Sequence, residues 1–358
     1  MILENFIQAK LNKMNRKEII QLRLFNQGLS TNCFEKPDEV VAHFGAIQAQ
    51  DYLMALWAVG LRIKSPNRSA IENLINSGEI IRTHILRPTW HLVHQKDIRW
   101  MLELSAPNVK KATQYVDKKE GLTDELFLKA WKIIEQKFRE IDNLTKEDIM
   151  TYLSEQQITV GNLLATQIII RAELEMLLCN GEKKGTYALF EKRVPMTGKI
   201  SKVEAITKLT QLYFKSRGPA TLKDFAWWSG LSLGDAKIGI AELDKRLEYF
   251  ILNDLKYYYF KIESNIPQKT TLALLPCYDE YTVGYSEGRD IVLPTDLDKS
   301  KIGNGIFKSI ILSENEIVGT WRKSKKSPYF EIQTFSDNKE IQTMNAKKHI
   351  EKFNTFSR

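Results

Sequence analysis

One stretch of sequence, residues 215–260, restricts the fold of this chain more than any other. Thr221 can cap a short helix, LKDFAWWSG, which ends at Gly230. Ser232 then stands three residues before Asp235, which is the spacing of a capping box that opens a second helix. The predicted order is therefore helix, tight turn, helix, an arrangement that only a small group of compact motifs contains.

Two β-rich runs follow this helix pair. The runs are LEYFIL and LKYYYFKI, and Asn253 and Asp254 between them favour a hairpin turn. A helix-turn-helix followed by a hairpin is the winged-helix pattern, whose second helix commonly enters a groove of DNA. The stretch therefore predicts a DNA-binding unit.

The same order of elements can be traced twice more upstream. In the nearer copy, Thr145 precedes the helical run KEDIMTYLSEQ, a second helix follows from about Asn162, and GEKKGTYALF resembles a short wing. In the copy nearest the start, residues 37–63 and 70–78 are largely helical, and EIIRTHILRPTWHLVH is extended, with Pro88 placed as in a wing or an edge strand. The three copies share little residue identity, so the repeat is inferred from element order.

Beyond residue 262 the pattern changes to short β-like runs separated by turn residues, which is typical of a small barrel-like domain. We therefore expect an α+β protein with four parts. A chain of 358 residues is long enough to hold them. The expected parts are a first winged-helix unit with an N-terminal helix at 1–103, a second unit at 104–200, a third at 201–262 and a C-terminal β-barrel-like domain at 263–358.

Charge and composition narrow the choice of partners only modestly. The 52 Lys and Arg residues against 44 Asp and Glu give a net charge of +8, which fits nucleic acid, an anionic membrane surface or simple solubility. The start lacks the apolar core of a secretion signal and no later run is long enough to span a bilayer, so we expect a cytoplasmic protein. Cys33, Cys179 and Cys277 are widely separated, which argues against a disulfide framework and a zinc site and predicts buried apolar fillers.

Five separated blocks of the chain resemble, in order, blocks of the AlkZ-like winged-helix family of DNA glycosylases. The blocks are AIQAQD at 46–51, RTHILRPTWHLV at 82–93, RGPATLKDFAWWSGLS at 217–232, LLPCYDEYTVGY at 274–285 and GNGIFKSIILSENEIVGTWRK at 303–323. The resemblance implies three tandem winged helices and a C-terminal β-barrel that enclose a concave DNA-binding channel. It also implies hydrolysis of the N-glycosidic bond of alkylated bases in double-stranded DNA, by a nucleoid-associated monomer without a cofactor.

The family's catalytic motif is a glutamine, an apolar residue and a second glutamine, and Gln48, Ala49 and Gln50 match it. The resemblance carries the catalytic role to these two glutamines and no further. Side chains two positions apart share a face in extended backbone but not on a helix, so joint action needs an irregular segment here. Gly45 permits such a departure from helical geometry.

The chemistry of this motif favours one class of substrate. A glutamine amide is neutral, but its carbonyl can accept a water proton while its NH2 group donates elsewhere, so it can position a water molecule. That help suffices for a purine alkylated at N7 or N3, because the cationic base leaves without being protonated. The motif holds no lysine, which predicts a monofunctional enzyme that leaves an abasic site. Asp51 either stabilises the cationic sugar or accepts a proton from water, or, on the interpretation we favour, is a surface or capping acid.

The block at 82–93 offers candidate contacts to DNA. They are Arg82, His84, Arg87, Thr89 and His91. Either arginine can reach a phosphate, and a wing that places the other polar groups beside DNA fits an extended backbone from 82 to 91. For each histidine the competing interpretation is a hydrogen-bonded side chain near the core.

A second candidate contact is the densest basic cluster near aromatic residues. It consists of Arg322, Lys323, Lys325 and Lys326, directly after Trp321. The cluster can follow a phosphate backbone, or it is a solvated hairpin tip. Of the adjacent tryptophans at 227 and 228, one is expected to fill the core and the other to meet a neighbouring unit.

Two classes of function compete for this sequence. A glycosylase is favoured by the five blocks, whereas a non-catalytic winged-helix regulator is favoured by how often that fold binds DNA without catalysis. A metal-dependent nuclease ranks third, because no carboxylates or histidines have ligand-like spacing. Asp279, Glu280 and Tyr281 lie in a matched block but receive no role beyond a structural or channel-lining one.

Overall fold

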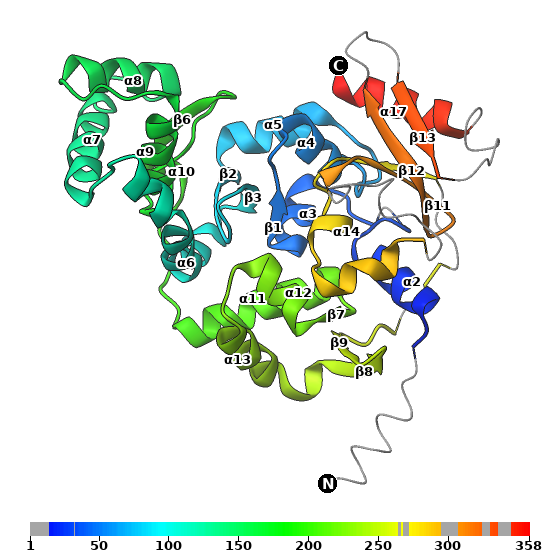
Figure 1. Ribbon diagram of the computed structural model, residues 1–358. Coiled ribbons are helices and arrows are strands. Elements are labelled where there is room, and N and C mark those ends of the chain that lie inside the picture. Colours follow the sequence, from blue (N-terminus) through cyan, green and yellow to red (C-terminus); the bar gives the residue numbers. More distant parts are fainter. Residues whose placement is uncertain are drawn as a thin grey trace. The chain divides into compact units, whose positions relative to one another are not determined.

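The computed structural model describes residues 14–31, 33–263, 266–267, 272–294, 307–323, 330–335 and 345–358. These residues form a mixture of helices and small antiparallel sheets (Figure 1). They divide into two compact units, of which unit 1 comprises 1–71, 206–228 and 232–358, and unit 2 comprises 72–205 and 229–231. Each unit is described by itself.

Unit 1 carries the glutamine motif, residues 215–228 and 232–260, and the C-terminal strands. Its elements are α2 (Arg16–Asn26), α3 (Pro37–Phe44), β1 (Ala46–Gln48), α4 (Tyr52–Gly60), α11 (Lys202–Arg217), β7 (Ala220–Thr221), α12 (Leu222–Ser229), α13 (Leu233–Leu243), η1 (Asp244–Arg246), β8 (Glu248–Leu252), β9 (Leu255–Tyr259), β10 (Ala273–Leu275), α14 (Glu280–Val283), η2 (Glu287–Val292), β11 (Ile310–Ser313), β12 (Glu316–Lys323), β13 (Phe330–Thr334) and α17 (Asn345–Ser357).

Unit 2 carries the hairpin that contains the block at 82–93. Its elements are α5 (Arg68–Ser77), which begins in unit 1, then β2 (Ile80–His84), β3 (Trp90–His94), α6 (Ile98–Lys119), α7 (Asp124–Lys137), β4 (Leu144–Thr145), α8 (Lys146–Glu155), α9 (Asn162–Leu174), β5 (Leu178–Asn180), β6 (Thr186–Leu189) and α10 (Phe190–Arg193).

The local predictions for residues 215–260 are confirmed. The Ser232 hydroxyl accepts the backbone N–H of Asp235 at 3.0 Å and opens α13, as the capping spacing predicts. Asn253 and Asp254 have φ angles of 49° and 62° and form the two-residue turn between β8 and β9. The strands β7, β9 and β8 form one antiparallel sheet in that order. Trp228 is fully buried in this part of unit 1, as one of the two tryptophans was expected to be.

The nearer upstream copy has the same order of elements. The elements follow in the order α7, β4, α8, α9 and the β5–β6 hairpin, and the sheet order is β4-β6-β5. Thr145 caps α8 by accepting the backbone N–H of Asp148 at 3.1 Å, and α9 begins at Asn162 as predicted. The three helices bury a common apolar core that includes Phe127 and Ile168.

The hairpin of the first copy is shorter than the sequence predicts. Strands β2 and β3 pair with Arg82 opposite Leu92, but β2 ends at His84. Leu86 has a φ angle of 63°, in the left-handed region, and Pro88 lies in the turn. The expectation of extended backbone through residues 82–91 is therefore wrong between the two strands, and Arg87 and Thr89 belong to the turn.

The C-terminal strands correct the prediction of a barrel. Strands β10, β11, β12 and β13 form one antiparallel sheet in that order, so within the described part of the chain the sheet is open at β10 and β13. Helix α17 packs on it through Phe353, whose ring lies 5.0 Å from that of Trp321 and 5.3 Å from that of Trp57 in α4. Trp57 also donates its indole N–H to the carbonyl of Leu274 in β10 at 2.8 Å, which fixes α4 against the sheet.

The cysteine prediction holds at one position of three. All three thiols are free, and only Cys179 is fully buried, whereas Cys277 is partly buried and Cys33 is exposed. Across the described ranges, no three His, Cys, Asp or Glu side chains gather as a metal site would require. Within the same ranges, no helix combines the length and the apolar character needed to cross a bilayer.

Candidate active site

The glutamine motif lies in a short non-helical segment between α3 and α4. Gly45 ends α3 with a φ angle of 72°, a conformation that favours glycine, and β1 then runs extended to Gln48. Asp51 caps α4 by accepting the backbone N–H of Met54 at 3.1 Å. The irregular segment predicted around 45–50 is therefore present, and Asp51 is the capping acid that we favoured.

The three motif residues differ in exposure. Gln48 is 6% exposed and Ala49 is completely buried. Gln50 lies at the surface of unit 1. The motif therefore passes from the interior to solvent within three residues, and Ala49 anchors it in the core.

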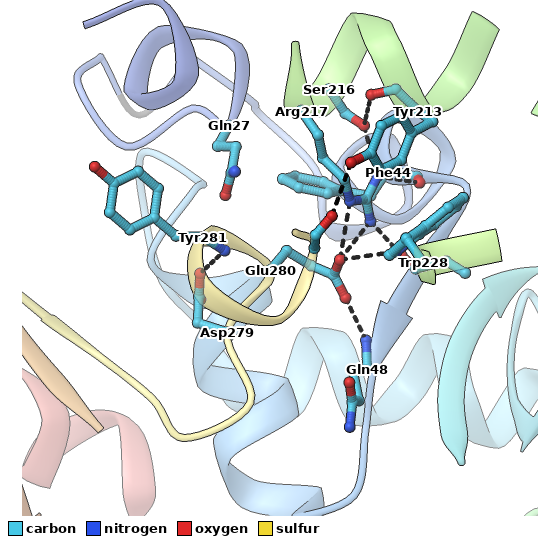
Figure 2. A network of polar contacts seen from close by, with 12 residues as sticks. Gln27, Phe44, Gln48, Tyr213, Ser216, Arg217, Trp228, Asp279, Glu280 and Tyr281 are labelled. Carbon is cyan, nitrogen blue, oxygen red and sulfur yellow. Dashed lines mark hydrogen bonds and ion pairs between the residues drawn. The ribbon is translucent and has the colours of Figure 1, made fainter. Parts of the chain in front are cut away.

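A buried carboxylate holds the backbone of Gln48. Glu280 Oε1 accepts the Gln48 backbone N–H at 2.8 Å. Figure 2 shows the Glu280 carboxylate between this backbone and the guanidinium of Arg217, with the amide of Gln48 pointing away from the ion pair. Glu280 Oε2 accepts Arg217 Nε at 2.9 Å, Arg217 Nη2 at 2.7 Å and the indole N–H of Trp228 at 3.1 Å. Glu280 is 1% exposed, so these donors replace the water that the carboxylate loses on burial.

Arg217 holds the turn that precedes the motif. Its Nη1 donates to the carbonyl of Phe44 at 3.0 Å and its Nη2 to the carbonyl of Ala46 at 2.8 Å, on the two sides of Gly45. The guanidinium also lies 4.1 Å from the ring centre of Trp228. The Arg217–Glu280 pair thus contacts the carbonyl of Ala46 and the amide of Gln48, which are the two ends of β1.

A second buried ion pair lies next to the first in sequence. Asp279 accepts two hydrogen bonds from Arg62, at 2.8 and 3.0 Å, and both side chains are almost fully buried. Asp279 also caps α14 by accepting the backbone N–H of Tyr281 at 2.9 Å. Tyr281 itself is buried. Asp279, Glu280 and Tyr281 are therefore buried in unit 1, and Glu280 in addition contacts the motif.

Burial also sets the protonation of two groups beside this segment. Burial, opposed by a hydrogen bond to the Asn26 carbonyl, lowers the pKa of His43 to about 4, with Arg217 and Arg62 contributing in the same direction as burial. His43 is thus neutral at physiological pH. Burial first, and then the charge of Asp51, raises the pKa of the Cys277 thiol to about 12. The thiol is therefore protonated at neutral pH and is no nucleophile for this chemistry.

The two histidines among the predicted DNA contacts of the β2–β3 hairpin are buried in unit 2, whereas Arg82, Arg87 and Thr89 are partly exposed. His84 is buried, with Nδ1 2.6 Å from the carboxylate of Glu173. His91 is also buried, and its Nδ1 lies 2.9 Å from the carbonyl of Thr89. Both histidines thus take the hydrogen-bonded position near the core that was the competing interpretation. Arg82 is partly exposed and stacks over the ring of Trp90 at 4.1 Å.

The basic cluster after Trp321 is only partly described. Arg322 and Lys323 are exposed at the end of β12, and Arg322 forms an ion pair with Glu331 on β13. Lys325 and Lys326 lie outside the described residues. A cavity of about 660 Å³ in unit 1 adjoins this end of the sheet, and its lining includes Met54, Cys277, Lys308, Arg322 and Lys323.

Sequence reasoning missed Glu280, Arg217 and Trp228 as supports of the motif. Gln48 and Glu280 are 232 positions apart, and no local pattern reports such a pair. The available signal was a glutamate inside an otherwise apolar run, LLPCYDEYTVGY, because a charge in such a run is expected to have a buried partner.

The fold and the motif segment together define a mixed α and β protein with a non-helical glutamine segment. Comparison with known proteins identifies the family to which it belongs. The solved structure of Streptomyces sahachiroi DNA glycosylase AlkZ has a TM-score of 0.79, with 17% identity and 97% of each chain covered, so the two chains share a fold. The sequence profile of the DNA glycosylase AlkZ-like family matches residues 41–340, and the chain belongs to this family. A relative from the same organism, named an interstrand DNA cross-link repair glycosylase, is 21% identical over 346 residues, which is 86% of this chain and 88% of the relative.

Proposed function

We propose that this chain is a monofunctional DNA glycosylase that hydrolyses the N-glycosidic bond of alkylated, cationic purines in double-stranded DNA. The observation that carries the proposal is the non-helical Gln48-Ala49-Gln50 segment, which is fixed at its buried end and exposed at Gln50, in a member of this family. The relative named an interstrand DNA cross-link repair glycosylase supports cross-links as part of the substrate class. The N7 and N3 adducts are proposed from the chemistry of the two neutral amides.

The two glutamines would act by placing one water molecule against the sugar. Their amides can accept from and donate to water without changing charge, and a purine that is already cationic leaves without a proton donor. The neighbouring carboxylates are engaged elsewhere, because Glu280 is paired with Arg217 and Asp51 caps α4. The reaction therefore depends on position and local electrostatics more than on proton transfer.

The chain would bind DNA as a monomer, through several winged-helix units. The element order helix, strand, helix, helix, hairpin recurs at α7–β6 and α11–β9, and α3–β3 follows the same order in sequence, which supports three such units. We propose Arg82 and Arg87 as phosphate contacts. Arg322 and Lys323 would contribute at the end of β12, and Thr89, Lys325 and Lys326 remain predicted contacts.

The test measures base release from a duplex that contains one 7-methylguanine. The wild-type chain should release the base, and Gln48→Ala/Gln50→Ala should abolish release while duplex binding persists. Gln50→Ala alone is the cleaner variant, because an exposed side chain can be truncated at a cost of about 0.5 kcal/mol or less. Release that survives the double change removes the proposed site. No release from several alkylated duplexes, with salt-sensitive binding intact, would instead identify a non-catalytic DNA-binding protein.

A further inference from the structure

The geometry points to Glu280 as the positioning residue of the glutamine motif. We infer that its carboxylate, held by Arg217 and Trp228, sets the place of Gln48 and thereby the rate of the hydrolytic step, without touching DNA. The inference rests on the proposed function, since it assigns a support to the same motif.

The contact is specific to the motif backbone. Glu280 Oε1 accepts the N–H of Gln48 at 2.8 Å, and Gln48 is the last residue of β1. This hydrogen bond joins a charged acceptor to a backbone amide, and such bonds are stronger and shorter than neutral ones. Because both partners are buried, water cannot replace the bond when it is lost.

The carboxylate itself has little freedom to move. Oε2 accepts three donors, two from Arg217 and one from Trp228, all between 2.7 and 3.1 Å. Arg217 in turn donates to the carbonyl of Ala46, two residues before Gln48. One ion pair therefore fixes the motif strand through both an N–H and a carbonyl.

The full set of hydrogen bonds to the Glu280 carboxylate distinguishes a positioning role from a catalytic one. Glu280 is 1% exposed, Oε1 holds Gln48 and Oε2 is shared by three donors, so the carboxylate is placed to hold β1 rather than to take a proton from water. Its effect on the reaction passes through Gln48. A displacement of about 1 Å in a group that positions a reactant can slow a reaction by about 100-fold.

The decisive variant is Glu280→Gln, which keeps the shape of the side chain. An amide cannot accept from Gln48 on one side and from Arg217 and Trp228 on the other, because one of its two ends is a donor. We expect the single-turnover rate of base release to fall by about 10-fold to 100-fold. The dissociation constant for duplex DNA should stay within about twofold of the wild-type value, since no DNA contact is removed.

Asp279→Asn is the matched control. Asp279 is the neighbouring residue, is equally buried and is also paired with an arginine. Its partner Arg62 follows α4, and its carboxylate contacts Arg62 and the backbone of α14. The same carboxylate-to-amide change should destabilise the fold to a similar degree and slow base release by less than about threefold. An equal loss of rate in both variants would overturn the assignment, because it would show a general effect of weakening the core.

A double-mutant cycle on the rate of base release tests whether Glu280 acts through Gln48 or only stabilises the fold. If Glu280 acts through Gln48, Glu280→Gln should cause no further loss of rate in a Gln48→Ala background. A full second loss in that background contradicts the inference. Should Glu280→Gln fail to fold, Arg217→Lys keeps the charge beside Glu280 but cannot reproduce the guanidinium's separate hydrogen bonds to the carbonyls of Phe44 and Ala46. It should slow release in the same Gln48-dependent way.

Hydrogen exchange separates failure of this inference from failure of the proposed function. Peptides that cover residues 46–50 should exchange their amide hydrogens faster in Glu280→Gln than in the wild type. In Asp279→Asn the exchange rate of these peptides should equal that of the wild type. Both expectations hold whatever the activity of the chain. Unchanged exchange in Glu280→Gln, together with an active wild type, refutes the positioning role alone. An inactive wild type with the expected exchange difference refutes the proposed reaction and leaves the assignment of Glu280 as the support of this segment.

Discussion

Removing the carboxylate of Asp279 should destabilise unit 1 more than any surface change. Arg62 is 1% exposed and forms two hydrogen bonds with Asp279, so Asp279→Ala leaves a buried guanidinium without its counter-charge. Breaking one partner of a buried pair costs about 3–5 kcal/mol. The N-cap of α14 is lost as well, at about 1 kcal/mol. The remaining contacts of Arg62, to the carbonyls of Gln27 and Ala58, offset part of this.

We therefore expect a loss of about 3–5 kcal/mol in the free energy of unfolding, measured by urea denaturation with the slope compared between variants. Arg322→Ala is the control, since its ion pair with Glu331 is exposed on both sides and should contribute at most about 1 kcal/mol. A loss below about 1 kcal/mol in Asp279→Ala would refute the view that Arg62 is held as a buried charge by this carboxylate.

Three further perturbations follow from the same region. The pKa of His43 is lowered to about 4, so as the pH falls the unfolded chain takes up a proton before the folded chain does. The free energy of unfolding therefore has its full value above pH 6.5 and falls toward pH 4 by up to about 1.4 kcal/mol per pH unit. His43→Gln, which can still donate to Asn26, should flatten the pH dependence of the urea midpoint, and an unchanged profile would contradict this origin. At pH 8 iodoacetamide should modify the exposed Cys33 well before Cys277, whose pKa is raised to about 12, and equal rates by mass spectrometry would count against that burial. Gly45→Ala should cost about 1–3 kcal/mol of stability, because φ of 72° with ψ of −50° is a conformation that a residue with a Cβ rarely adopts. No shift in melting temperature would argue against the turn.

Local chemistry made the helical and hairpin parts of this fold predictable. Ser232 with Asp235, and Asn253 with Asp254, determine a cap and a turn through contacts within three residues, and each is present as predicted. Closure of the C-terminal strands depends on which distant strands pair, and the sequence pattern does not contain that information. The spacing of the β-rich runs therefore predicted the strands but not their arrangement. Over the described residues these strands form an open sheet instead of a barrel.

The candidate site was predictable at the motif and not around it. Gln48 and Gln50 were found from a short pattern, and the non-helical backbone that they need followed from Gly45. The support from Glu280 comes from 232 residues away and depends on burial, which only the folded chain shows. For the same reason the sequence suggested His84 as a surface contact to DNA, whereas in the folded chain it is buried beside Glu173.

The central claim, that two neutral amides position the attacking water, is tested most directly by single-turnover release of 7-methylguanine from duplex DNA by Gln50→Ala. Gln50 lies at the surface of the unit, so the change should leave folding and duplex binding intact. The account predicts a fall in rate of about 100-fold at unchanged affinity. Release at the wild-type rate would contradict it.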